Sequence, residues 1–238
     1  MTHSDQLIHI FFGNKLNAVL KSKLLHADAK SSLLISPLTK IKEEFNLKSC
    51  FFLQQVHGVD GLVVDEKYMK EKFLSQEGDF IITNCANIGI GVLTADCLPI
   101  IMVDTQRNAI GIAHAGWRGS VQKIGPIMLH ALQKNFNANA SDITVYCGPS
   151  ALPCCYEVNQ EFKENLEKDL AQKTIINRNG VLFFDLPLYN KLLLLNAGIP
   201  QENFISTYNQ CTLCTPNYCS YRKEKDDDLR QVTLVSLK

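Results

Sequence analysis

The sequence lacks any long hydrophobic run, which excludes a helix that crosses a membrane. No stretch reaches the roughly 18 apolar residues that such a helix needs, and the longest apolar segments are interrupted by Asp96, Asp104 and His114. After the polar start MTHSDQL, the segment IHIFF is too short for the hydrophobic part of a signal peptide. We therefore expect a cytoplasmic protein with no membrane partner.

An excess of charge of one sign is also missing. The 238 residues include 24 Lys+Arg and 24 Asp+Glu, so the formal net charge is zero. Bulk electrostatic binding to nucleic acid is therefore not expected, although a local basic pocket is compatible with this balance. Hydrophobic residues make up 46% of the chain, enough to build a sizeable core.

Internal repeats and linkers rich in Pro, Gly or Ser are absent from the sequence, so residues 1–238 are predicted to form a single domain. Segments rich in Ile, Val and Phe predict strands at 7–12, 49–56, 61–65, 79–83, 88–93, 100–104, 109–115, 143–148, 181–185 and 231–237. Helices are predicted from an N-cap at Ser120, over 157–170 and over 188–198. Many strands with helices late in the chain predict an α+β fold built in layers. The charged stretch RKEKDDDLR at 222–230 is interpreted as a solvated hairpin tip.

Cysteine, in contrast, is abundant, with nine residues. An odd number without a signal peptide argues against a disulfide framework and favours reduced thiols. The motif CTLC at 211–214, with Cys219 nearby, is a candidate for half of a structural zinc site. Cys154 and Cys155 are candidates for the other half, but adjacent side chains diverge on an extended chain. Buried or loop thiols are therefore the preferred interpretation, with a second metal site as the alternative.

The segment TADCLPI at 94–100 places Asp96 and Cys97 side by side in an apolar region. A buried carboxylate is costly unless it is paired, so this combination suggests a built site. His57 in QQVHG and His114 in AHAGWRG each lie beside Gly at a predicted strand end. Two imidazoles and a thiolate suit zinc, and three protein ligands leave one position open, as in catalytic sites. Ordinary core positions for these three residues are the alternative. No role is predicted for His3, His9, His26 and His130.

Six blocks of the sequence resemble those of a known family and occur in the family's order. They are QVHG (55–58), TADCLPI (94–100), HAGWRG (114–119), CGPSALPCCYEV (147–158), CT (211–212) and SYRK (220–223). Together they resemble the YfiH-type, laccase-domain family over roughly residues 50–238. Its members are known as purine nucleoside phosphorylases with adenosine deaminase activity, and earlier as multicopper polyphenol oxidases.

The resemblance implies a mixed central β-sheet in a layered α/β/α arrangement. It also implies that His57, Cys97 and His114 form a catalytic metal site, usually for zinc, with copper as an alternative occupant. The implied reactions are phosphorolysis of adenosine, inosine and methylthioadenosine, and deamination of adenosine. Purine nucleosides and phosphate are then the partners of a monomer or homodimer.

Three other functions compete with this interpretation. A peptidoglycan-precursor amidase would use the same metal site, and a non-catalytic metal-binding protein would need no substrate pocket. Polyphenol oxidation is disfavoured, because a multicopper site needs many histidines and the chain has six, mostly scattered.

Three residues are candidate substrate contacts. Arg118, in a Gly-flanked loop after His114, is suited to bind phosphate or a ribosyl oxygen through two hydrogen bonds. A salt bridge to Asp96 is the alternative role for Arg118. Arg222 is a second candidate for the anion, with solvent exposure as its alternative, and Gln55 is a candidate hydrogen-bonding partner of substrate.

The sequence departs from the family's pattern in two places. The family's N-terminal loop resembles FSTRGGVS, whereas this chain has FFGNKLNAVL, in which Gly13 and Lys15 are interpreted as remnants of that loop and the Arg is absent. In the block at 147–158, Ser150-Ala151-Leu152 replaces a Gly-containing turn. Both departures concern substrate binding more than metal binding.

Overall fold

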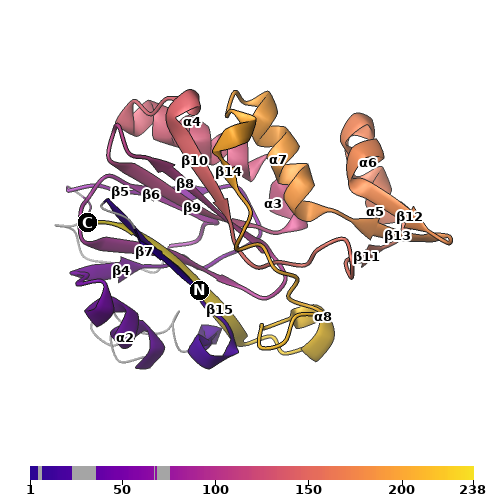
Figure 1. Cartoon of the computed structure of the whole chain (residues 1–238), viewed down its shortest axis with the longest axis horizontal. Coiled ribbons are helices and arrows are strands. Elements are labelled where there is room, and N and C mark those ends of the chain that lie inside the picture. The colour runs from indigo at the N-terminus through magenta and orange to yellow at the C-terminus, as the bar shows by residue number, and fades with distance from the viewer. Residues whose placement is uncertain (5–6, 23–35, 67, 69–75) are drawn as a thin grey trace.

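Two six-stranded sheets lie face to face, and helices cover the outer face of each (Figure 1). This arrangement is seen in a computed structural model that describes residues 1–4, 7–22, 36–66, 68 and 76–238. In these parts of the chain, no helix has the length and apolar character needed to cross a membrane.

The first sheet carries most of the site. Its strands, in spatial order, are β14 (Phe204–Ile205), β10 (Ile143–Cys147), β8 (Leu98–Asp104), β9 (Ala109–Ala115), β6 (Phe80–Thr83) and β5 (Gly61–Val64). The β10–β14 and β5–β6 pairs are parallel and the others antiparallel, so the sheet is mixed. All seven positions of β8 and of β9 are buried, because layers cover both faces, and this explains their continuous apolar sequences.

The second sheet joins the two ends of the chain. Its strands are β1 (Thr2–Ser4), β2 (Ile8–Phe12), β15 (Leu229–Leu237), β7 (Ile88–Thr94) and β4 (Ser49–Phe51), with β3 (Val19–Leu20) paired to β15. Strand β15 lies between β2 and β7, so the C-terminal strand is central to this sheet.

A small third sheet and the helices complete the structure. The third sheet has the order β11 (Glu157–Val158), β13 (Val181–Phe184) and β12 (Ile175–Arg178). The helices are α2 (Ser36–Glu44), α3 (Trp117–Val121), α4 (Ile124–Phe136), α5 (Gln160–Glu164), α6 (Lys168–Thr174), α7 (Leu186–Asn196) and α8 (Tyr221–Glu224). Short 3-10 turns cover Lys15–Asn17, Ala140–Asp142 and Gln201–Asn203.

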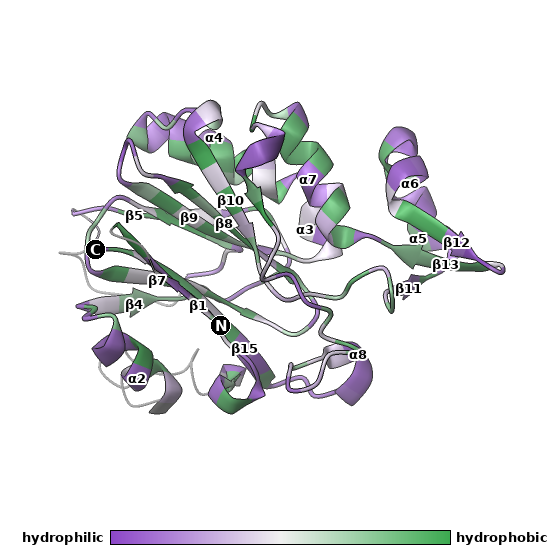
Figure 2. Cartoon of the chain, in the orientation of Figure 1, coloured by the Kyte–Doolittle hydropathy of each residue, from purple (hydrophilic) through white to green (hydrophobic). Residues whose placement is uncertain are grey.

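Three hydrophobic clusters hold the layers together. The two sheets pack through residues such as Ile10 and Ile90 from one sheet against Ile101 and Ile112 from the other. Helices α4 and α7 cover the outer face of the first sheet, and α2 covers that of the second. Figure 2 shows the strands to be mostly hydrophobic, whereas the helices mix hydrophobic with hydrophilic residues, as expected for elements buried on one side only.

The predicted α+β class and layered arrangement are confirmed, but two stacked mixed sheets take the place of the single central sheet that was expected. Most predicted strands are present, although only Ser49–Phe51 of the segment 49–56 is a strand. The prediction of one helix over 157–170 is wrong. Its first two residues form β11, and the rest divides into α5, which ends at Glu164, and α6, which begins at Lys168. Helix α2 and strand β12 were not predicted.

The prediction that Ser120 is an N-cap is also wrong. Ser120 lies inside α3, where its hydroxyl donates to the carbonyl of Gly116 at 2.8 Å and accepts from Asn190 at 2.9 Å. Lys123, with a left-handed φ of 66°, separates α3 from α4. The third predicted helix is present as α7, whose N-cap is Asp185, and Gly198 follows its end with φ of 97°.

Candidate active site

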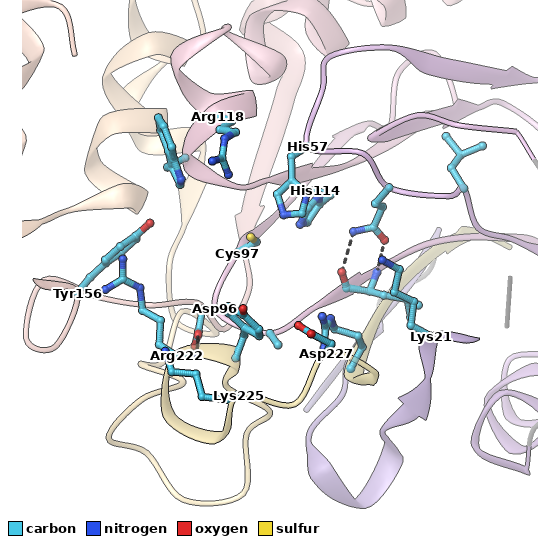
Figure 3. Close-up of a pocket in the computed structure, with 17 residues that line it drawn as sticks. Lys21, His57, Asp96, Cys97, His114, Arg118, Tyr156, Arg222, Lys225 and Asp227 are labelled. Carbon is cyan, nitrogen blue, oxygen red and sulfur yellow. Dashed lines mark hydrogen bonds between the residues drawn. The ribbon is translucent and has the colours of Figure 1, made fainter. Parts of the chain in front are cut away.

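Three segments distant in the sequence bring His57, Cys97 and His114 together (Figure 3). His57 lies in the loop after β4, Cys97 in the turn between β7 and β8, and His114 near the end of β9. One ligand atom from each residue lies within 4.8 Å of the other two. The β8–β9 pairing fixes this proximity, because it aligns Leu98 with Ala115, next to His114.

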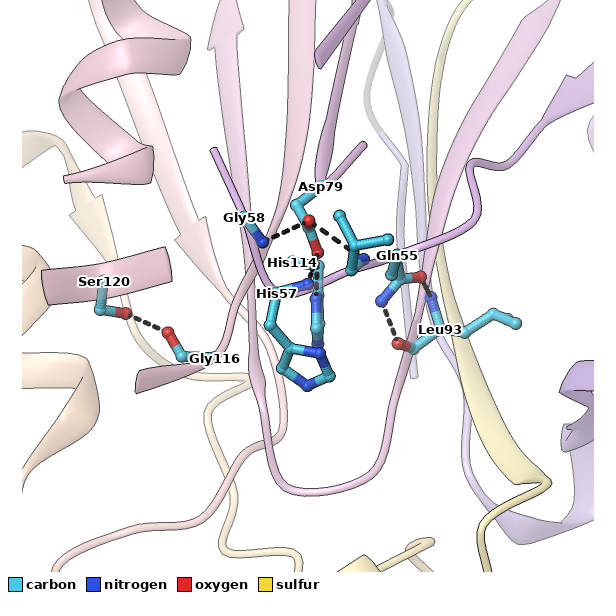
Figure 4. Close-up of polar contacts among 9 residues, drawn as sticks. Gln55, His57, Gly58, Asp79, Leu93, His114, Gly116 and Ser120 are labelled. Atoms are coloured by element: carbon cyan, nitrogen blue, oxygen red, sulfur yellow. Dashed lines mark hydrogen bonds and ion pairs between the residues drawn. The ribbon is translucent and has the colours of Figure 1, made fainter. Parts of the chain in front are cut away.

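Asp79 holds the segments of both histidines in place through hydrogen bonds (Figure 4). Its carboxylate accepts hydrogen bonds from the backbone N–H groups of Val56 at 3.2 Å, His57 at 3.0 Å and Gly58 at 2.7 Å. It also contacts Nδ1 of His114 at 2.8 Å. Asp79 is only 1% exposed, and these four contacts compensate for the loss of water around its charge.

The contact to Asp79 determines which ring nitrogen of His114 faces the site. A buried carboxylate only accepts, so Nδ1 of His114 carries the proton. Burial alone would raise the pKa of Asp79, but His114 and the backbone N–H groups outweigh burial and lower it, which keeps the carboxylate ionised. Nε2 of His114 is therefore left to interact with Cys97 or with a metal ion.

The electrostatics of the site favour a thiolate at Cys97. Burial alone would raise the pKa of this thiol, but His114 and His57 outweigh burial and lower it to about 6. Burial alone would likewise lower the pKa of His114, but Cys97 and Asp79 raise it to about 9. Without a metal ion, the thiolate and imidazolium therefore stabilise each other at neutral pH, and a bound cation would replace the imidazolium proton.

The absence of a side chain at Gly116 lets Cys97 and His57 lie close to the backbone of this residue. A Cβ atom at this position would lie 3.0 Å from Sγ of Cys97 and 3.1 Å from Cδ2 of His57. Both distances are shorter than ordinary van der Waals contact, and both neighbours belong to the site itself. A side chain at position 116 would therefore force Cys97 or His57 to shift by a few tenths of an ångström.

Asp96 connects the turn that carries Cys97 to the C-terminal part of the chain. Its carboxylate accepts from the hydroxyl of Thr212 at 2.6 Å and from the backbone N–H of Arg222 at 2.7 Å, and its carbonyl accepts from the N–H of Ala151 at 2.8 Å. The backbone of Asp96 has a left-handed φ of 84°. The buried carboxylate beside Cys97 is therefore a positioning group, satisfied by a hydroxyl and a backbone N–H.

The three residues line a cavity of about 760 Å³ that is predominantly basic. The other lining residues are Lys21, Leu53, Gln55, Leu93, Ala95, Asp96, Trp117, Arg118, Tyr156, Tyr221, Arg222, Lys225, Asp227 and Arg230. Five of the lining side chains are cationic and two are anionic. A neutral chain thus concentrates positive charge where an anion would meet the three candidate ligands.

Both predicted arginines line this cavity. The guanidinium of Arg118 lies 4.7 Å from the centre of the Trp117 ring, and within the described residues no carboxylate forms an ion pair with it. Arg222 lies 4.3 Å from the centre of the Tyr156 ring and donates to the carbonyl of Glu157 at 2.8 Å. Its side chain is thus held against the cavity wall, although it is exposed.

Gln55 also lines the cavity, but its amide is occupied by the backbone of Leu93. It accepts from the N–H of Leu93 and donates to the carbonyl of Leu93, both at 2.8 Å. Lys15 pairs with Glu224 and is absent from the cavity lining, so it does not replace the Arg of the family's N-terminal loop. His26 lies outside the described residues.

Residues 222–230 do not form a hairpin tip, although most of them up to residue 227 are exposed, as predicted. Arg222, Lys225, Asp227 and Arg230 all line the cavity, because α8 and the start of β15 form one of its walls. Sequence reasoning also missed Asp79, Lys21 and the part of this wall that follows Arg222, since none of them lies in a motif. A single acidic residue at the start of the buried strand 79–83 was the only signal for Asp79.

The cysteines expected to be ordinary thiols gather in a second cluster. The sulfur atoms of Cys154, Cys155, Cys211 and Cys214 all lie within 4.8 Å of one another. The argument that Cys154 and Cys155 diverge is wrong because the chain turns here, with the N–H of Cys155 bonded to the carbonyl of Leu152 at 2.9 Å. Cys219 is buried elsewhere and does not join this cluster.

Comparison with known proteins identifies the family. Residues 28–238 match the family described as multi-copper polyphenol oxidoreductase laccase. This chain belongs to that family. The resemblance seen in the sequence motifs is thereby confirmed.

Relatives and solved structures extend the comparison. A purine nucleoside phosphorylase from Aquifex aeolicus is 40% identical over 68% of this chain and 72% of its own. A protein named adenosine deaminase RL5, from an unknown prokaryotic organism, is 33% identical over 68% of this chain and 64% of its own. The crystal structure of the YfiH protein of Bacillus licheniformis has a TM-score of 0.82 at 22% identity, covering 97% of this chain and 93% of its own. That similarity shows the fold.

Proposed function

We propose that this protein is a zinc-dependent purine nucleoside enzyme. It cleaves adenosine, inosine and methylthioadenosine with phosphate, and it deaminates adenosine. The observation that carries the proposal is the opening of the His57–Cys97–His114 group into a basic cavity of about 760 Å³. Cavities of roughly 300–1,000 Å³ are typical of small-molecule sites. Relatives named for phosphorolysis and for adenosine deamination support the choice of substrate.

The donor set fits zinc. Two imidazoles and a thiolate are ligands of suitable softness, and three of them leave a position open for substrate or water. The thiol of Cys97 already has a lowered pKa, and Asp79 orients His114 as such ligands are oriented in zinc enzymes. When bound here, zinc supplies Lewis acidity that activates water at neutral pH. Copper suits the same donors, but one group of three ligands does not make a multicopper oxidase.

The cationic side chains supply the phosphate site. The guanidinium of Arg118 forms no ion pair with a carboxylate among the described residues. It packs against the ring of Trp117, close to the end of β9. Arg222 is fixed on the opposite wall by Tyr156 and by the backbone of Glu157 (Figure 3). A phosphate between these arginines would accept paired, charge-assisted hydrogen bonds and would be positioned for attack on the ribose.

The remaining groups hold the reacting parts in place. Asp79 keeps the proton on Nδ1 of His114 and ties the backbone of His57 to the site. Asp96 anchors the N–H of Arg222, so the turn that carries Cys97 and the wall that carries Arg222 move together. Such positioning accounts for a large share of catalysis when two substrates must meet.

The test incubates purified protein with adenosine or inosine, with and without phosphate, and separates the products by chromatography. Base release that depends on phosphate supports phosphorolysis, and inosine formed from adenosine supports deamination. Arg118→Ala should raise the apparent KM for phosphate while deamination of adenosine is largely kept. Arg107→Ala, which changes an arginine on the β8–β9 turn outside the cavity, is the matched control. Zinc-loaded protein that yields neither product would contradict the proposal.

A further inference from the structure

The four-cysteine cluster of Cys154, Cys155, Cys211 and Cys214 lies outside the site described above. It joins the segment before β11 to the segment that follows β14. These two segments are already paired through the backbone, because the N–H of Ser150 donates to the carbonyl of Gln210 and the N–H of Thr212 donates to the carbonyl of Ser150, both at 3.0 Å. Four thiols thus converge at a fixed junction.

The sulfur spacing fits a single tetrahedral ion. With zinc–sulfur bonds of about 2.3 Å, two sulfurs of a tetrahedral site lie about 3.8 Å apart. The sulfurs of Cys154 and Cys214 are 3.8 Å apart, and all four lie within 4.8 Å of one another. A disulfide would need about 2.05 Å. A [4Fe–4S] cluster, in which each cysteine binds a different iron, would hold the four sulfurs farther apart.

The surroundings of the cluster also suit a bound cation. Cys211 is only 4% exposed, so its sulfur is shielded from water. On the rim, the guanidinium of Arg178 donates to the carbonyl of Cys154 at 3.5 Å and brings positive charge toward a site whose four thiolates exceed the charge of Zn²⁺.

We propose that Cys154, Cys155, Cys211 and Cys214 bind one structural zinc ion, distinct from the metal held by His57, Cys97 and His114. Four protein ligands leave no open position, so this ion has a structural and not a catalytic role.

The position of the zinc explains what it stabilises. Cys155 precedes Tyr156, which packs under Arg222 at 4.3 Å, and Cys211 precedes Thr212, whose hydroxyl bonds Asp96 at 2.6 Å. Both neighbours belong to the wall of the basic cavity or hold it in place. The zinc therefore links the segment of Cys154 and Cys155 to the segment of Cys211 and Cys214, which would otherwise be joined by few hydrogen bonds.

The test counts zinc in protein purified under reducing conditions, after loosely bound metal has been removed by gel filtration. The wild-type chain should hold two equivalents. Cys214→Ser changes an exposed ligand and should hold one, and Cys97→Ala should also hold one, from the other site. The double variant should hold none. Cys85→Ser, outside both groups, is the matched control and should keep two.

Cobalt substitution identifies the site in the folded protein. The cobalt form of Cys97→Ala should show the thiolate-to-metal absorption of a four-sulfur site, and Cys214→Ser should lose that component while its circular dichroism remains that of a folded chain. Cys97→Ala without zinc would overturn the proposal, as would Cys214→Ser with unchanged zinc content. An intact mass that shows a disulfide among the four cysteines would also overturn it. None of these results depends on nucleoside turnover, so the proposal fails or stands independently of the proposed function.

Discussion

Replacing Asp79 by Asn removes the charge that contacts both histidines and leaves the size of the side chain nearly unchanged. In the wild-type protein the carboxylate accepts three backbone N–H groups and the Nδ1–H of His114. An Asn side chain offers one acceptor oxygen and one NH₂ group that only donates. At least one of the four contacts must therefore be lost, whichever way the amide is turned.

The magnitude follows from where the NH₂ group points. If it faces His114, the ring must accept at Nδ1 and carry its proton on Nε2, the nitrogen needed for metal. Loss of such an orienting partner weakens metal binding by about 10–100-fold. If the NH₂ group takes the place of Oδ2 instead, the part-buried N–H groups of Val56 and Gly58 are left unpaired, at a cost of about 1–3 kcal/mol in the free energy of unfolding.

The assay is competition for zinc against a chelator, combined with thermal unfolding of the zinc-free protein. Asp79→Asn should bind zinc at the His57–Cys97–His114 site at least about ten-fold more weakly than wild type. Asp142→Asn, a half-buried position with a 3.9 Å contact to Arg107, is the control and should change neither quantity. Wild-type zinc affinity and wild-type stability in Asp79→Asn together would refute the role assigned to Asp79.

Two further predictions concern the same site. In metal-free protein, the rate of Cys97 alkylation, followed by mass spectrometry, should rise with pH through a midpoint near 6. The reason is that the thiolate is the reactive form and the pKa of this thiol is lowered to about 6. A midpoint above 8 would contradict the thiolate–imidazolium pairing. Gly116→Ala should lose zinc from this site while remaining folded, because its Cβ would lie about 3 Å from Cys97 and His57. The control is Ala197→Gly at the end of α7, which also changes one methyl group and should keep the zinc. Wild-type zinc content in Gly116→Ala would show that the close approach is not required.

The parts of the site that lie in motifs were predictable from sequence. His57, Cys97 and His114 combine ligand chemistry with strand ends and with family blocks, and the structure brings them within reach of one ion. Asp79 was not predictable in this way, because a lone carboxylate before a buried strand has many structural roles. Lys21 and Arg230 reach the cavity only through the pairing of β15 with β3 and β7, which no local pattern encodes.

The fold shows the same division between local and long-range information. Apolar segments such as 88–93 and 100–104 predicted strands, but apolar composition does not specify which sheet a strand joins. The two strands are consecutive in the chain and lie in different sheets, with Cys97 in the turn that crosses between them. Likewise, Cys154 and Cys155 were judged on an extended chain, whereas a turn directs both sulfurs to one point.

Adenosine turnover by Cys97→Ala protein, assayed with zinc supplied in the buffer, tests the central claim most directly. Removal of the thiolate leaves two imidazoles, too few to hold zinc tightly at the catalytic position. We predict loss of both phosphorolysis and deamination, loss of the zinc bound at this site, and a decrease of only about 1–3 kcal/mol in the free energy of unfolding. Cys85→Ser should retain wild-type activity. Turnover of adenosine by Cys97→Ala at the wild-type rate would contradict the account.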